Sequence, residues 1–287
     1  NVRVETDEAT GESLVHTPAG DLRQVKVYDE GSGTVYTREH LVKGPEDFEA
    51  FRAMIADEVY EADYETARTE IDRSGMATVD VPATPLMHLL MWVMDVQPTL
   101  MAMMERPDEM ADLMAFMHER NLDYYRVAAA GPGEIVRPME DTSAMLTGPR
   151  MYAEHSVAHL NDYAAVTHDA GKLFLPHMCG HVGGMLDVLV EIDLDGIEAI
   201  TAPPLGDADV AEMRRRLPEA WLIGGVDPSQ YATATPEQMR SHVQGTLESM
   251  RGDRRFMLGH EEIPLAARVE NVEIVAEPDV LEALPTL

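Results

Sequence analysis

The sequence predicts an α/β fold of the TIM (β/α)8-barrel type, and two observations support this. Over the second half of the chain, short apolar runs alternate with helical patterns, which is typical of parallel strands joined by crossover helices. Polar residues follow the ends of these runs, and in a barrel the carboxyl ends of all strands share one face. No glycine-rich dinucleotide or Walker pattern follows any run, which disfavours a nucleotide-binding, doubly wound sheet.

Length and composition set the class of protein. A chain of 287 residues with 45% apolar residues can bury a large core, and we expect residues 1–287 to form a single barrel domain. It contains no apolar run long enough to span a membrane and no secretory signal pattern. Its single cysteine excludes an internal disulfide, so we expect a cytoplasmic protein.

The formal charge of −30 restricts the partners. Such a surface repels nucleic acids and anionic membranes, so we exclude both as main partners. Lysine is confined to Lys26, Lys43 and Lys172, and high acidity with few lysines indicates a halophilic source, where salt screens the self-repulsion. An acidic docking face for a basic partner is the alternative, which the even spread of the acids disfavours.

The first part of the chain combines hairpins and helices. Residues 1–43 alternate apolar and polar side chains between glycine-containing turns, which predicts a small hairpin extension at the edge of the barrel. Acidic residues follow Pro45 and Pro107, as expected in first helical turns. One strand is expected at Gly75–Val81. We expect helices at residues 45–59, 62–72, 86–94, 99–105 and 107–129.

The second part repeats one unit of strand and helix. We expect strands at residues 134–139, 172–176, 196–201, 220–224 and 255–258, and helices at residues 150–170, 185–191, 209–217, 236–251 and 270–275. His177 and Cys179 follow the second of these strands. Residues two apart share a face of an extended chain, so imidazole and thiolate can converge as zinc ligands. The alternative is a small buried cysteine beside a hydrogen-bonded histidine.

Further polar residues follow the other predicted strands. One His and one Cys from a strand, with a carboxylate or His from another, would give three protein ligands and an open position, the pattern of a catalytic zinc site. Taken singly, these residues can also cap a helix, form a turn or be solvated. The candidates are Glu140, Asp141, Asp227, His260, Glu261 and Glu262.

Several motifs resemble the uroporphyrinogen decarboxylase superfamily. They are Pro-His-Met-Cys-Gly at 176–180, Asp-Gly-Ile-Glu-Ala-Ile at 195–200, Pro-Pro-Leu-Gly-Asp at 203–207, Gly-Val-Asp-Pro at 225–228, and Leu-Gly-His-Glu-Glu-Ile-Pro at 258–264 followed by Glu-Asn at 270–271. The resemblance covers the chain from about Thr17 onward and implies a TIM barrel. Family members carry a further N-terminal segment that supplies the first strand. We therefore expect a barrel that lacks this strand through loss of an N-terminal segment, or one closed by a partner; a homodimer is compatible with this pattern.

The resemblance also implies a chemistry. The His-x-Cys pair resembles the zinc methyltransferase branch, which serves corrinoid proteins, more than the metal-free porphyrinogen decarboxylases. It implies zinc held by His177 and Cys179, with Glu261 where many members of that branch carry a second cysteine. His260 is the alternative ligand if the alignment shifts by one.

We therefore expect a zinc-dependent methyltransferase of the O-demethylase type. It would transfer a methyl group from a small methoxylated donor to a corrinoid protein or a thiol. A zinc with one thiolate, one imidazole and one carboxylate is a better Lewis acid than a thiolate-rich zinc, which suits an ether oxygen. The expected catalytic residues are Glu140, Asp141, Asp227 and Glu262, which would relay protons, hold the ligating histidine or bind the substrate.

Two other functions stay open from the sequence. One is a metal-free, decarboxylase-like enzyme in which Asp141 or Asp227 grips the substrate. Tetrapyrrole substrates carry several carboxylates, and the candidate cations to bind them are Arg137, Arg150 and Arg268. The other is a degenerate, non-catalytic member that binds a corrinoid protein or a small ligand.

Overall fold

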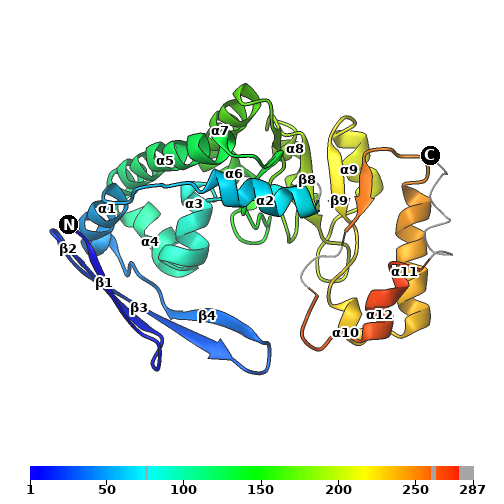
Figure 1. Ribbon diagram of the computed structural model, residues 1–287, viewed down its shortest axis with the longest axis horizontal. Coiled ribbons are helices and arrows are strands. Elements are labelled where there is room, and N and C mark those ends of the chain that lie inside the picture. The colour runs from blue at the N-terminus through cyan, green and yellow to red at the C-terminus, as the bar shows by residue number, and fades with distance from the viewer. Residues whose placement is uncertain (75–76, 260–262, 278–287) are drawn as a thin grey trace. The chain divides into compact units, whose positions relative to one another are not determined.

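The computed structural model describes residues 1–74, 77–259 and 263–277. The chain divides into two compact units, Asn1–Glu134 and Ile135–Leu287, which are described separately (Figure 1). Across the described residues, no helix has both the length and the apolar character needed to cross a membrane.

The first unit begins with an antiparallel sheet in the order β1-β2-β3-β4, as the alternating pattern predicted. Its strands are Arg3–Asp7, Glu12–Thr17, Gly20–Asp29 and Thr34–Glu39. Val15 and Leu22 are buried and face each other across β2 and β3. Helix α1 (Phe48–Ala56) packs on these two strands and buries Phe48 and Phe51.

Helices make up most of the rest of the first unit. The long helix α5 contacts α1, α3, α4 and β5, and so forms the centre of this helical layer. The elements are η1 (Pro45–Asp47), α2 (Tyr64–Ser74), β5 (Thr78–Val81), α3 (Pro85–His88), the π-helix η2 (Leu89–Val93), α4 (Val96–Glu105) and α5 (Pro107–Ala130).

The second unit contains the predicted parallel strands, which confirms the α/β class. They are β6 (Ile135–Pro138), β7 (Leu173–Phe174), β8 (Gly196–Ile200), β9 (Trp221–Gly224) and β10 (Phe256–Leu258). β6 pairs with β7, and β9 pairs with both β8 and β10, all in parallel. Single parallel bridges join His177 to Met139 and to Glu198. Among the described residues these strands form open sheets.

Helices connect the strands of this unit, and the structure differs locally from the prediction. The expected helix at 150–170 is broken at Ser156, whose φ of −122° leaves helical geometry. The expected strand at 172–176 is only two residues long, because Pro176 has no N–H to donate to a neighbour. The helices are α6 (Gly148–His155), α7 (Val157–Asp169), η3 (Gly183–Met185), α8 (Leu186–Leu189), α9 (Val210–Arg216), α10 (Gln230–Thr233), α11 (Pro236–Ser249) and α12 (Val269–Ile274).

Candidate metal centre

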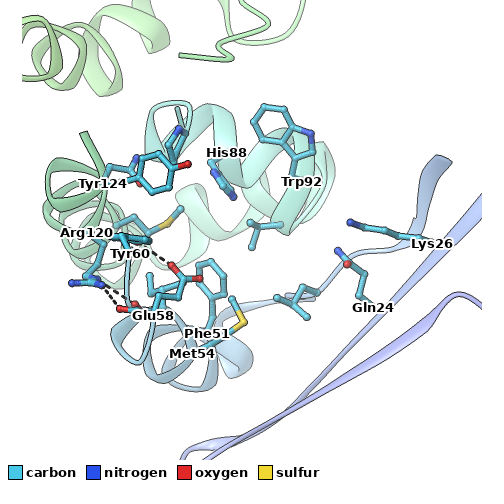
Figure 2. A pocket seen from close by; sticks show the side chains of 16 residues that line it. Gln24, Lys26, Phe51, Met54, Glu58, Tyr60, His88, Trp92, Arg120 and Tyr124 are labelled. Carbon is cyan, nitrogen blue, oxygen red and sulfur yellow. Dashed lines mark hydrogen bonds between the residues drawn. The ribbon is translucent and has the colours of Figure 1, made fainter. Parts of the chain in front are cut away.

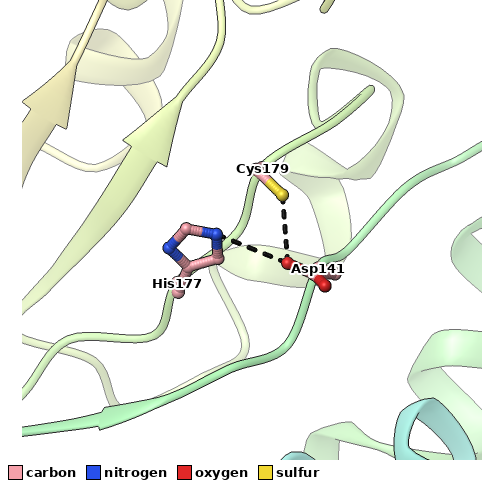
Figure 3. A group of neighbouring side chains, drawn as sticks. All are labelled: Asp141, His177 and Cys179. Atoms are coloured by element: carbon pink, nitrogen blue, oxygen red, sulfur yellow. Dashed lines mark hydrogen bonds and ion pairs between the residues drawn. The ribbon is translucent and has the colours of Figure 1, made fainter. Parts of the chain in front are cut away.

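Asp141, His177 and Cys179 bring one carboxylate, one imidazole and one thiol together in the second unit (Figure 3). One ligand atom from each lies within 4.8 Å of the other two. The Cys179 thiol donates a hydrogen bond of 3.0 Å to Oδ1 of Asp141, and Nε2 of His177 lies 3.4 Å from the same oxygen. In the part of the chain that the structure describes, no other group of His, Cys, Asp and Glu side chains has this spacing.

Backbone hydrogen bonds between the ends of β6 and β7 create this arrangement. The N–H groups of Glu140 and Asp141 donate to the carbonyl of His177 at 3.0 and 3.1 Å, and the N–H of His177 donates to the carbonyl of Pro138 at 2.8 Å. Asp141 has a φ of 41°, in the left-handed region that non-glycine residues rarely adopt. Such conformations concentrate at functional sites. Here the carboxylate of Asp141 faces both His177 and Cys179 (Figure 3).

A second carboxylate fixes the orientation of the His177 ring. Glu198, in the middle of β8, places Oε2 at 2.6 Å from Nδ1 of His177 and at 3.2 Å from a guanidinium nitrogen of Arg137. When the neutral ring donates its Nδ1 proton to Glu198, its other nitrogen presents a lone pair. That nitrogen, Nε2, is buried and has no hydrogen-bond partner among the described residues. It faces Asp141, as expected for a histidine prepared to bind a cation.

The electrostatics of the centre favour a positive charge. Burial opposes the imidazolium of His177, but its interactions with Asp141, Cys179 and Glu198 outweigh burial and raise the pKa of His177. Burial raises the pKa of the Cys179 thiol. For Asp141, burial is outweighed by the proximity of His177 and the hydrogen bond from Cys179, which lower its pKa. A cation between the three groups would meet the carboxylate of Asp141 and would stabilise the thiolate.

The donor set fits zinc. Imidazole nitrogen, thiolate sulfur and carboxylate oxygen are the three ligand types that zinc takes in proteins, and three protein ligands with an open position are typical of catalytic sites. The buried Nε2 of His177, without a hydrogen-bond partner in the described part of the chain, provides the clearest vacant donor.

A cavity of about 280 Å³ adjoins the centre. Besides His177 and Cys179, it is lined by His181, Thr201 and Leu205, with Gly180 and Pro228. The described lining therefore contains no arginine or lysine.

The structure places the other candidate residues outside the group of three. Glu140 is fully buried and accepts a hydrogen bond of 2.8 Å from the hydroxyl of Tyr152, which in turn accepts one from Thr142. Asp227 is also fully buried. Its Oδ1 accepts a hydrogen bond of 2.8 Å from the N–H of Ser229, and its Oδ2 has no partner among the described residues. His260, Glu261 and Glu262 lie outside the described residues.

Comparison with known proteins identifies the family. The sequence matches the uroporphyrinogen decarboxylase (URO-D) family over residues 4–278. The chain belongs to this family. A comparison with curated proteins finds no match.

Two solved structures share the fold of this URO-D chain. A methyltransferase from Methanosarcina mazei aligns with a TM-score of 0.64 at 14% identity, covering 88% of this chain and 74% of that one. A B12-independent methionine synthase from Shewanella sp. W3-18-1, in complex with selenomethionine, aligns with a TM-score of 0.56 at 11% identity, covering 91% and 72%. At these identities the similarity shows the fold alone.

The family match confirms the predicted resemblance, and the structure refines the predicted site of this URO-D chain. It brings together His177 and Cys179 and adds Asp141, which was predicted as a catalytic residue and not as a ligand. The supporting role of Glu198 was missed, and so was that of Arg137, which was considered only as a substrate-binding cation. One sequence signal was present, because Glu198 is the single charged residue in the apolar strand 196–200.

Proposed function

We propose that this URO-D protein is a zinc-dependent methyltransferase that transfers a methyl group from a small methylated donor to a corrinoid protein or a thiol acceptor. The convergence of Asp141, His177 and Cys179 carries the proposal, together with the buried Nε2 of His177 that faces Asp141. The similarity in fold to a methyltransferase and to a methionine synthase supports methyl transfer as the reaction class.

His177, Cys179 and Asp141 would hold the zinc, and Glu261 or His260 stays a further proposed ligand outside the described residues. When bound, zinc would supply Lewis acidity to the leaving atom of the methyl donor, an ether oxygen in the case of a methoxylated substrate. Asp141 accepts the hydrogen bond of the Cys179 thiol at 3.0 Å, so two of the ligand groups are in contact before a metal binds, and metal binding would release the thiol proton.

Glu198 and Arg137 would keep the centre in order. Glu198 holds Nδ1 of His177 and thereby directs Nε2 towards the metal position. Arg137 lies 3.2 Å from the same carboxylate oxygen and fixes Glu198 in turn. Both side chains are largely buried, which limits their freedom to turn away.

The cavity beside the centre favours a small donor over a tetrapyrrole. Porphyrinogens carry several carboxylates, which require several cationic partners, and the described lining of the cavity contains no arginine or lysine. Arg137 is engaged by Glu198, and Arg268 donates to the carbonyl of Ala234 at 3.3 Å. These contacts disfavour the metal-free decarboxylase alternative.

Zinc content tests the proposal directly. We expect stoichiometric zinc in the purified protein, loss of most of it in Cys179→Ser, and weaker retention in Asp141→Asn. Asp187→Asn is the matched control, because this aspartate is exposed and belongs to the same unit. Unchanged zinc in both site variants would contradict the proposed centre.

Two further measurements complete the test. Glu261→Ala asks whether this residue adds a ligand, and a drop in zinc affinity would support that role. Methyl transfer to a free corrinoid, measured by its absorption spectrum, distinguishes an enzyme from a degenerate member, which would bind zinc without transferring a methyl group.

A further inference from the structure

A second cavity, of about 310 Å³, lies wholly within the first unit, between strand β3 and helices α1, η2 and α5 (Figure 2). This volume is in the range of small-molecule sites. Much of its wall is aromatic, with Phe51, Tyr60, Trp92 and Tyr124 among the lining residues. Aromatic walls of this kind favour a flat, apolar ligand body, through stacked or edge-to-face contacts.

One side of the cavity carries polar groups that no described residue engages. Gln24 and Lys26 both lie on β3, on either side of a shift in its register with β4, and both line the cavity. Both side chains point into the cavity (Figure 2). Neither forms a hydrogen bond or an ion pair with its side chain among the described residues. In contrast, Lys43 pairs with Glu39 at 3.3 Å and donates to backbone carbonyls.

The absence of an acidic partner for Lys26 is informative in a chain with 52 acidic residues. Arg120, the other cation of the lining, is fully engaged: it donates to the carbonyl of Glu58 at 2.8 Å, to the carbonyl of Ile55 at 3.2 Å and to the carboxylate of Asp123 at 2.9 Å. Lys26 is therefore the cation of the lining that pairs with no acidic side chain among the described residues; it is exposed, and Glu58 is the carboxylate of the same lining.

The opposite side of the cavity offers a hydrogen-bond acceptor. Glu58 accepts a hydrogen bond of 3.0 Å from the hydroxyl of Tyr60 and lies across the cavity from Lys26 (Figure 2). His88 lies between these two sides, with its ring 5.4 Å from that of Trp92. Burial lowers the pKa of His88 to about 4, so its imidazole is neutral and neither repels nor attracts an anion strongly.

We propose that this cavity binds a small aromatic carboxylate. Its carboxylate would be held by the ammonium of Lys26 and the amide of Gln24, and its ring would lie against the aromatic wall. An anion is the class of ligand that compensates Lys26, and a planar ring is the body that the wall accommodates. Every residue involved belongs to Asn1–Glu134, so the inference is independent of the metal centre.

Calorimetric titration of the full chain with four probes tests the ligand class. The probes are benzoate, benzamide, cyclohexanecarboxylate and benzyltrimethylammonium, at constant ionic strength. We expect benzoate to bind about tenfold more tightly than benzamide, because one charge-assisted hydrogen bond contributes about 1.4 kcal/mol. Cyclohexanecarboxylate should bind more weakly than benzoate, because it cannot stack.

Two variants locate the binding. Lys26→Met should weaken benzoate binding about tenfold and leave benzamide binding unchanged. Arg3→Met is the matched control, since it removes one positive charge from an exposed position of the same sheet, and it should leave both affinities unchanged. Trp92→Ala should weaken benzoate and benzamide alike, and it tests the wall without altering the charge.

Several outcomes would overturn the proposal. Absence of benzoate binding at millimolar concentration would do so, as would equal affinities for benzoate and benzamide or for benzoate and cyclohexanecarboxylate. Tighter binding of benzyltrimethylammonium would assign the cavity to cations held by Glu58 and the aromatic rings. An equal loss of benzoate binding in Arg3→Met would show that the overall charge of the sheet, and not Lys26 itself, determines the affinity.

Discussion

The metal centre and the aromatic cavity use polar residues in opposite ways. In the centre, Glu198 holds His177, Arg137 holds Glu198, and Asp141 accepts from Cys179. Each contact fixes a donor before any ligand arrives. In the cavity of the first unit, Lys26 and Gln24 are left unengaged by the described residues, although acids are abundant in the sequence. The residues of the metal centre are thus already positioned to bind a cation. Lys26 and Gln24 of the cavity, in contrast, remain available to bind a ligand.

This difference has an energetic consequence. Removal of one partner from the centre leaves another buried charged group poorly compensated, which costs several times more than loss of an exposed ion pair. Substitution of Lys26 leaves no buried charge behind, because its side chain is exposed and unpaired among the described residues. The centre should therefore be sensitive to supporting residues, and the cavity only to residues that touch the ligand.

The largest expected effect comes from Glu198→Gln. Glutamine can still accept from Nδ1 of His177, but it removes the negative charge that strengthens the ring as a ligand and that balances Arg137. Loss of such a supporting carboxylate typically weakens metal binding about 10- to 100-fold. We expect zinc affinity, measured by competition with a chelator, to fall within that range.

Glu191→Gln is the control for this prediction, because Glu191 is exposed in the same unit. Glu198→Asp should recover part of the affinity, since it restores the charge at a shorter reach. An unchanged zinc affinity in Glu198→Gln would show that His177 needs no supporting carboxylate, and the contrast between the two regions would lose its basis.

Local patterns predicted much of the fold and the centre of the site, whereas the support of the site required the three-dimensional structure. The His-x-Cys spacing after a strand was enough to predict that His177 and Cys179 converge. The position of Asp141 depended on its φ of 41° and on the register between β6 and β7, which no periodicity encodes. Glu198 meets His177 through a single parallel bridge between segments distant in sequence.

The break of the predicted helix at 150–170 has a similar origin. Ser156 is fully buried and its backbone leaves helical angles, although no proline or glycine marks the position. A sequence pattern reports only the helical propensity of the flanking residues. At Ser156 the tertiary structure outweighs that propensity. The cavity of the first unit could likewise not be predicted from sequence periodicity, because its lining comes from one strand and several helices.

His88 tests the aromatic cavity through the pH dependence of stability. Its folded pKa of about 4 lies below the unfolded value of about 6.5, so its contribution is fully present above the unfolded pKa and is lost as the pH falls towards 4. Between about pH 7.5 and pH 4.5 the loss amounts to about 2.5 kcal/mol. In His88→Gln this loss should be absent, which urea unfolding at both pH values would measure.

His16→Gln, on strand β2, is the control for this measurement, because it leaves His88 intact and should keep the loss attributed to that residue. An identical change in the free energy of unfolding for the wild type and His88→Gln would show that the cavity wall does not keep this ring neutral. The ring of His88 could then carry a positive charge in the folded protein, as the ring of His177 can in the metal centre.

The smallest expected effect separates support of the fold from binding of metal within the second unit. Tyr152 is fully buried, and burial together with the charge of Glu140 raises its pKa well above the usual value, so its hydroxyl stays a donor. Tyr152→Phe removes the 2.8 Å hydrogen bond to Glu140 and should lower the free energy of unfolding by about 1.5 kcal/mol. Zinc content should not change, because Glu140 is outside the group of Asp141, His177 and Cys179.

Tyr28→Phe, at an exposed position, is the matched control and should alter neither the free energy of unfolding nor the zinc content. A loss of zinc in Tyr152→Phe at full stability would instead place Glu140 within the network that holds the metal.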